Sequence, residues 1–249
     1  MSAAGAIINI AVGIVYVVIG TLVLIDLKRG WRTMGYSHFG VGFIALAFTC
    51  GPHHLAHGLH IAEGRPGAAL DLISVLVGLP AAASFSLLRI EAFRGGRGDR
   101  FISGTPGWLL ALPTLAGIYL TAIGFAAFQG AKGKLQFSPL IIPNILLVGI
   151  YATIGYFLLR TQITNRRSTG GWSLSGLSLA GLFPTCAVMH ATYAFYSITG
   201  RYQFDVHGFA IDWVSVPAGL YFLWAVRALY RESLTDWNRV PAEHLATVT

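Results

Sequence analysis

The chain has 249 residues, of which 55% are hydrophobic and 11% are charged, and its mean hydropathy is +0.64. These values lie outside the range of soluble globular proteins and indicate an integral membrane protein. The formal net charge is +7. The distribution of the basic residues along the chain accounts for this charge, so it gives no reason to expect a nucleic-acid partner.

Seven segments are apolar and long enough to cross a bilayer as helices, since a crossing needs about 20 residues. The sequence before the first one has no basic residue, so we expect this segment to stay as a helix and not to be removed as a signal peptide. The predicted segments are Ile7–Ile25, Met34–His60, Ala68–Leu88, Pro106–Phe128, Ser138–Leu159, Trp172–Ser197 and Phe209–Tyr230.

The basic residues predict the orientation, because Lys and Arg accumulate in cytoplasmic loops. Thirteen of the seventeen follow the first, third, fifth or seventh segment, and only Arg65, Lys132, Lys134 and Arg201 lie on the other side. We therefore expect a multi-pass protein of the cell membrane with its N-terminus outside and its C-terminus in the cytoplasm. The thirteen are Lys28, Arg29, Arg32, Arg89, Arg94, Arg97, Arg100, Arg160, Arg166, Arg167, Arg227, Arg231 and Arg239.

An internal repeat is visible when the two ends of the chain are aligned. "NIAVGIVYVVIGTLVL" from Asn9 matches "NILLVGIYATIGYFLL" from Asn144, and "GYSHFGVGFIALAFTCGPHH" from Gly35 matches "GWSLSGLSLAGLFPTCAVMH" from Gly171. "DLISVLVGL" from Asp71 matches "DWVSVPAGL" from Asp212, and eighteen of the forty-five aligned positions are identical. The offset changes only in loops, which indicates a tandem duplication of three helices.

The predicted fold is all-α, with seven helices arranged as a 3+1+3 duplication. The single connecting helix makes the two repeats cross the membrane in the same direction, related by a pseudo-twofold axis along the membrane normal. The predicted boundaries are 1–104 for the first repeat, 105–132 for the connecting helix, 133–230 for the second repeat and 231–249 for a cytoplasmic tail.

Polar residues that are identical in both repeats are candidates for a shared site on this axis. His54 and Asp71 are expected at similar depth near the outer face on adjacent helices, as are His190 and Asp212, because helices rise 1.5 Å per residue. The identical pairs are Asn9 and Asn144, Tyr16 and Tyr151, Thr49 and Thr185, Cys50 and Cys186, His54 and His190, Asp71 and Asp212, and Ser74 and Ser215.

The stretch "TCGPHHLAHGLH" adds further histidines to the first repeat. His53, His57 and His60 follow an i, i+4, i+7 spacing that places three imidazoles on one helical face. Imidazole, carboxylate and thiolate together suit Zn or Cu, and ionisable groups inside a membrane usually belong to a site. The expected ligand set is His53, His54, His57, His60, His190, Asp71, Asp212, Cys50 and Cys186.

Other interpretations of the same residues stay open. His54 and His190 could instead be the two axial ligands of a b-type haem, or the His/Asp pairs could form a proton relay. The cysteines could be packing thiols or a disulfide, and the aspartates could cap their helices. His60 and His207 suit the membrane interface, while His38 and His244 lie toward the cytoplasm.

"CAVMHATYAFY", with Met189, His190 and Tyr193, and the His-rich end of the second segment resemble the MHYT membrane sensor domains. The resemblance implies Met, His and Tyr residues near the outer face that bind copper to sense oxygen, carbon monoxide or nitric oxide. The chain departs from that family in its three-helix repeat and in having no output domain after the last segment. Microbial rhodopsins share seven helices, but the last segment has no lysine for retinal. The zinc hydrolases of the ceramidase kind have a His-x-x-x-His on the last helix that is missing here.

Three classes of function follow. The first is a membrane protein whose outer-face site binds a transition metal, Cu or Zn, for sensing or for handling a metal or small ligand. The second is an enzyme, either a metal-dependent lipid hydrolase or a haem electron-transfer protein, with no catalytic residue assigned. The third is a proton- or metal-linked transporter. The expected partners are the lipid bilayer, a protein partner if the chain signals, and further copies in a homo-oligomer.

Overall fold

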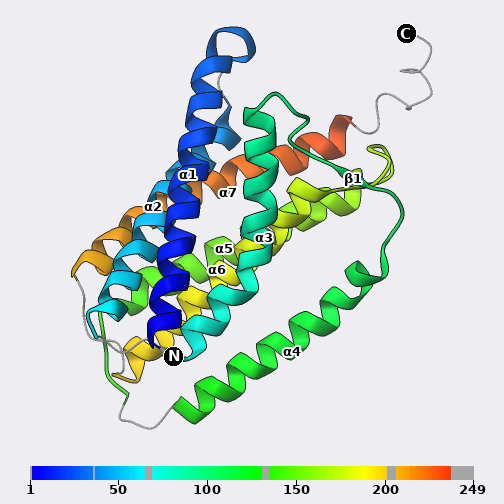
Figure 1. Cartoon of the computed structure of the whole chain (residues 1–249). Helices are drawn as coiled ribbons and strands as arrows, with labels where there is room; N and C mark the ends of the chain where they lie inside the picture. Colours follow the sequence, from blue (N-terminus) through cyan, green and yellow to red (C-terminus); the bar gives the residue numbers. More distant parts are fainter. Residues whose placement is uncertain (1, 36, 65–68, 131–134, 201–205, 237–249) are drawn as a thin grey trace, which may run out of the picture.

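The computed structural model describes residues 2–35, 37–64, 69–130, 135–200 and 206–236 (Figure 1). Within these ranges the chain forms seven α-helices and two strands of two residues each. All seven helices are long and apolar enough to cross a membrane. The prediction of a mainly α-helical protein with seven helices suited to crossing a membrane is confirmed.

The first and last helices extend well beyond the apolar segments that predicted them. The predicted segments Ile7–Ile25 and Phe209–Tyr230 are the membrane-crossing parts of helices with 33 and 31 residues. Hydropathy marks the part of a helix that suits lipid and does not mark where the helix ends. The helices are α1 Ser2–Met34, α2 His38–Ala62, α3 Ala69–Phe93, α4 Gly107–Gly130, α5 Ile141–Asn165, α6 Leu174–Ile198 and α7 Val206–Asp236.

Six of the helices pack into one bundle, and α4 stands apart from it (Figure 1). Helix α1 packs against α2 and α3, and α5 packs against α6 and α7. The two groups meet where α2 contacts α7 and where α3 contacts α6. Each contact made by α1–α3 therefore has a counterpart made by α5–α7.

The second and sixth helices begin with the same cap. Ser37 Oγ accepts a hydrogen bond from the Gly40 backbone N–H, and Ser173 Oγ accepts one from the Gly176 backbone N–H. A serine at this position satisfies a backbone donor that has no partner inside the helix. The two caps start α2 and α6 at equivalent positions of the aligned sequences, which brings His54 and His190 to the same height in their helices.

Glycines allow α1 and α2 to pack with their backbones in contact. A Cβ on Gly13 would lie 2.8 Å from the Gly51 carbonyl oxygen, and a Cβ on Gly58 would lie 3.0 Å from the Ala6 carbonyl oxygen. Small residues at such positions are the usual means of close helix packing in membranes. This close approach places Asn9 of α1 beside His54 of α2.

A short antiparallel ribbon, which the sequence did not predict, joins two loops. Strand β1, Phe101–Ile102, pairs with strand β2, Trp172–Ser173. The Asp99 carboxylate accepts hydrogen bonds from Ser173 Oγ at 2.6 Å and from the Ser175 backbone N–H at 2.9 Å. Two-residue strands are too short for any periodic signal in the sequence.

Candidate functional site

Two asparagine–histidine pairs lie inside the bundle, one in each group of three helices. His54 Nδ1 is 2.9 Å from Asn9 Oδ1, and His190 Nδ1 is 2.7 Å from Asn144 Oδ1. All four residues are buried, with exposed fractions between 0 and 3%. Each histidine is therefore held by a neighbouring helix, α1 for His54 and α5 for His190.

The asparagines determine which ring nitrogen carries the proton. Asn144 Nδ2 donates to the Leu140 carbonyl oxygen and to Asp212 Oδ2, both at 2.8 Å. Its carbonyl oxygen Oδ1 is therefore directed at His190, and Nδ1–H of His190 must be the donor. Asn9 Nδ2 donates to the Gly5 carbonyl oxygen in the same way. In the neutral form of each imidazole the lone pair is then on Nε2, the atom that a histidine with this hydrogen bond offers to a metal.

The two cysteines pair with tyrosines of the opposite group of helices. The Cys186 Sγ lies 3.4 Å from the Tyr16 hydroxyl, and the Cys50 Sγ lies 3.4 Å from the Tyr151 hydroxyl. Both cysteines are buried free thiols, so the disulfide considered from the sequence does not form. Each pair joins α1–α3 to α5–α7 across the middle of the bundle.

Among the histidines that the structure describes, His53 lies closest to Asp212. The Asp212 carboxylate Oδ1 is 3.2 Å from His53 Nδ1 and 4.0 Å from His190 Nδ1. The Asp212 and His53 side chains are 4 and 8% exposed. The ring centroid of His53 lies 5.8 Å from that of His190. Asp212 thus links the histidine of α2 to the Asn144–His190 pair, where the sequence had paired it with His190 alone.

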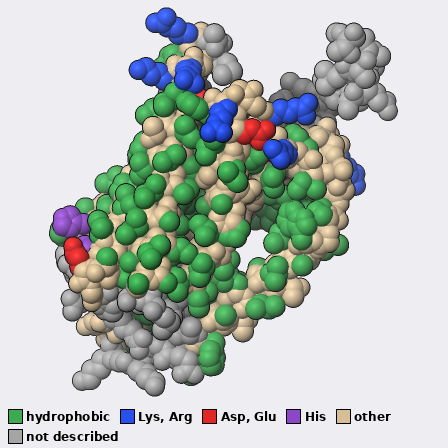
Figure 2. All heavy atoms as spheres, viewed as in Figure 1, with side chains coloured by type: hydrophobic (Ala, Val, Ile, Leu, Met, Phe, Trp, Pro, Cys, Tyr) green, Lys and Arg blue, Asp and Glu red, His purple; other side chains and the backbone are tan. Residues whose placement is uncertain are grey.

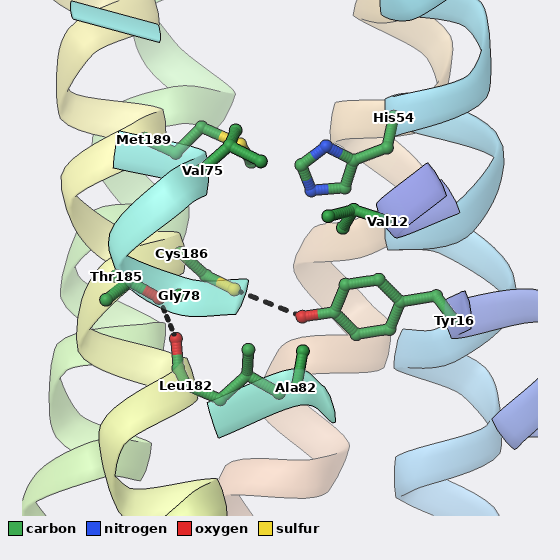
Figure 3. Close-up of a pocket in the computed structure, with 10 residues that line it drawn as sticks. All are labelled: Val12, Tyr16, His54, Val75, Gly78, Ala82, Leu182, Thr185, Cys186 and Met189. Carbon is green, nitrogen blue, oxygen red and sulfur yellow. Dashed lines mark hydrogen bonds between the residues drawn. The ribbon is translucent and has the colours of Figure 1, made fainter. Parts of the chain in front are cut away.

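A pocket opens between α1, α2, α3 and α6 (Figure 3). His54 and Tyr16 enter it from one side, and Cys186 and Met189 enter it from the opposite side (Figure 3). One imidazole, one thiol and one thioether therefore share a single small space. The lining residues are Val12, Tyr16, His54, Val75, Gly78, Ala82, Leu182, Thr185, Cys186 and Met189.

The remaining predicted ligands lie elsewhere. His57 is buried and packs against Tyr193 with ring centroids 5.1 Å apart, whereas His60 is partly exposed near the end of α2. Asp71 belongs to α3, but its side chain lies outside the described residues, as does all of His244. His38 lies at the start of α2, where its Nδ1 is 2.7 Å from the Tyr221 hydroxyl.

Eight of the nine expected ligands have side chains that the structure describes, and Asp71 is outside this set. Among the side chains that the structure describes, no group of three or more His, Cys, Asp and Glu residues is arranged to hold a metal ion. His53 is directed to Asp212, His54 to the pocket, and His57 to Tyr193. Of the three histidines with the i, i+4, i+7 spacing, His53 and His57 both contact the Tyr193 ring, and His60 is partly exposed near the end of α2.

The sequence indicated the asparagines, Tyr16 and Tyr151 as candidates for a shared site without giving them partners, and it gave Met189 a role only through the resemblance to MHYT domains. The sequence indicated Asn9 and Tyr16 only because identical residues, Asn144 and Tyr151, stand at the aligned positions of the predicted second repeat. Met189 has no identical counterpart, because the aligned residue of the first repeat is His53. No family model, curated protein or solved structure matches this chain, so the resemblance to MHYT domains rests on the residues quoted above.

Proposed function

We propose that the protein is a duplicated 3+1+3 membrane bundle that binds a transition metal ion between its two repeats. The matched helix contacts, the serine caps at Ser37 and Ser173, and the paired Asn–His and Tyr–Cys contacts support the duplication. The basic side chains gather at one end of the molecule (Figure 2), which supports a cytoplasmic C-terminus. With this orientation, the two Asn–His pairs lie toward the opposite, outer half of the bundle.

The observation that carries the metal proposal is the pocket with His54, Cys186 and Met189 in its lining. Asn9 holds the Nδ1–H of His54, which leaves Nε2 as the donor atom toward an ion. A thiolate, a thioether and an imidazole form a soft set of ligands, and such sets favour Cu(I) over harder ions. We therefore favour copper over zinc, for sensing or for handling the metal or a small ligand.

Metal analysis of the purified protein tests this proposal. We expect about one Cu(I) per chain after anaerobic loading, at higher affinity than Zn(II). The double variant Cys186→Ser with Met189→Leu removes both sulfur donors and is expected to lower copper affinity at least about a hundredfold. Cys50→Ser is the matched control, because Cys50 is also a buried thiol bonded to a tyrosine but does not line the pocket.

The same samples separate the alternatives. A Soret band that is lost in His54→Ala would favour the haem interpretation, and stoichiometric zinc with no copper preference would favour a hydrolase or a structural metal. Absence of bound copper, zinc and haem from the loaded parent protein would contradict the metal proposal.

A proton-linked transporter is the second candidate, favoured by the buried contact of His53 with Asp212. An imidazole and a carboxylate at 3.2 Å inside a membrane bundle are a common arrangement for proton transfer. In proteoliposomes, a pH gradient should then drive proton uptake that Asp212→Asn abolishes and Cys186→Ser preserves. Equal proton flux through the parent and Asp212→Asn would exclude this candidate.

A further inference from the structure

The ten residues that line the pocket have ten counterparts in the aligned sequences, here the counterpart set. Seven of the ten pairs are identical, against eighteen of the forty-five positions in the aligned segments as a whole. The two halves of the chain therefore agree more closely in this lining than along their length. The seven pairs are Tyr16 and Tyr151, His54 and His190, Val75 and Val216, Gly78 and Gly219, Leu182 and Leu46, Thr185 and Thr49, and Cys186 and Cys50.

Residues of the counterpart set also lie together in the structure. The Cys50 Sγ is 3.4 Å from the Tyr151 hydroxyl, and the Tyr151 ring centroid is 5.3 Å from that of His190. His53, which is aligned with Met189, has its ring centroid 5.8 Å from that of His190. A second group with an imidazole, a thiol and a tyrosine is thus assembled from α2, α5 and α6.

Two of the three pairs that differ place longer side chains in the counterpart set. Leu147 is aligned with Val12, and Leu223 is aligned with Ala82 when the third alignment is continued by three residues. Leu147 is 0% exposed and belongs to the buried apolar core, and Leu223 packs against this core. Because protein interiors are closely packed, longer side chains at two lining positions take up space that an ion would need.

The third pair that differs exchanges a sulfur for an imidazole. Met189 lines the pocket with its thioether, whereas His53 at the aligned position has its Nδ1 3.2 Å from the Asp212 carboxylate. A thioether is a soft donor that suits Cu(I), and imidazole beside carboxylate suits harder ions. The counterpart set therefore lacks the second sulfur of the pocket, and its extra histidine contacts a carboxylate instead.

We propose that the counterpart set is a closed copy of the pocket, so that each chain binds one Cu(I) ion and not two. Leu147 and Leu223 fill the copy, and the His53–Asp212 contact replaces its third donor. This inference rests on the proposed function, because it takes the pocket lined by His54 and Cys186 to be the copper site. Three residues then limit the number of ions, and they can be exchanged between the two sets.

Opening the counterpart set tests this proposal. The triple variant Leu147→Val, Leu223→Ala and His53→Met gives it the residues of the pocket and should bind two Cu(I) ions per full chain, where the parent binds one. The double variant Leu147→Val with Leu223→Ala keeps the His53–Asp212 contact and decides the question if the triple variant does not fold. It should also bind a second ion, more weakly than the triple variant, because it lacks the thioether. Anaerobic titration against a chromogenic Cu(I) chelator measures both numbers.

The opposite exchange provides a second test. Val12→Leu with Ala82→Leu places the longer side chains in the pocket and should abolish copper binding. Leu158→Val with Leu179→Ala is the matched control for the opened variants, because both leucines are buried and neither belongs to the pocket lining or to the counterpart set. This control should keep one ion per chain.

Two ions in the parent, one ion in the folded opened variants, or a second ion in the control would overturn the proposal. Copper retained by Val12→Leu with Ala82→Leu would also overturn it, because the ion would then be bound outside the pocket. A parent that binds no copper would instead contradict the proposed function, so the two failures give different results.

Discussion

Asn144 connects three buried polar groups of the site. It accepts from His190 and donates to Asp212 and to the Leu140 carbonyl, and it is 1% exposed. A buried polar group that loses its partner costs about 1–3 kcal/mol, because no water replaces the lost hydrogen bond. The histidine and the aspartate therefore depend on this amide for their orientation.

Replacing Asn144 with leucine should destabilise the bundle by about 2–4 kcal/mol, since it leaves polar atoms of two buried side chains without a partner. Thermal unfolding in detergent measures this effect. Thr153→Val is the control, because the Thr153 hydroxyl bonds only to the Gly149 carbonyl on the exposed face of α5. If the two variants unfolded at the same temperature, the Asn144 network would contribute no stability.

The sequence predicted which polar residues lie inside the bundle, but it did not predict which residue each of them contacts. His54, His190, the cysteines and Asp212 were expected inside the bundle because they recur, and all five are buried. The partner of each depends on how a helix is rotated about its own axis, and His190 Nδ1 lies 2.7 Å from Asn144 Oδ1 but 4.0 Å from Asp212 Oδ1. Hydropathy and spacing do not resolve such a rotation, so the Asn–His and Tyr–Cys pairs emerged only from the structure.

At the scale of the elements, the helices could be predicted and their contacts could not. Apolar runs of about 20 residues identify a membrane helix without any tertiary information. The separation of α4 and the β1–β2 ribbon depend on long-range contacts that leave no periodic pattern. The close packing of α1 and α2 has a visible cause in the glycines, but only the structure shows which glycines face a neighbouring helix.

Gly13 and Gly149 test the difference between a glycine that faces a neighbouring helix and one that does not. Gly13→Ala should destabilise the protein by about 1–3 kcal/mol, because its Cβ would lie 2.8 Å from the Gly51 carbonyl oxygen and would push α1 away from α2. Gly149→Ala has nothing within 4 Å of its Cβ and should be neutral or stabilising by up to about 1 kcal/mol. Unfolding temperatures of the two variants that changed in the same direction would contradict this account of the α1–α2 interface.

For the whole molecule, the arrangement of charge and the number of helices lead to one orientation. Seven helices are long and apolar enough to cross a membrane, and seven crossings would place the two termini on opposite sides of it. The basic side chains gather at the end of the bundle where α1, α3, α5 and α7 finish (Figure 2). Because Lys and Arg are retained on the cytoplasmic side, the end of α2 should face outward and the loop between α5 and α6 should face the cytoplasm.

Single cysteines introduced into the full chain test this orientation. Glu63 at the end of α2 and Ser168 in the α5–α6 loop are both exposed, whereas the native Cys50 and Cys186 are each only 8% exposed. A membrane-impermeant maleimide should therefore label Glu63→Cys in intact cells and label Ser168→Cys only after lysis. The parent chain serves as the control and should stay unlabelled in intact cells, because its thiols are inside the bundle.

Labelling of Ser168→Cys in intact cells, with Glu63→Cys protected until lysis, would mean that the chain is inserted the other way round. The His54 and Cys186 pocket would then lie in the cytoplasmic half of the membrane, and the copper that we propose for it would come from the cytoplasm and not from outside the cell.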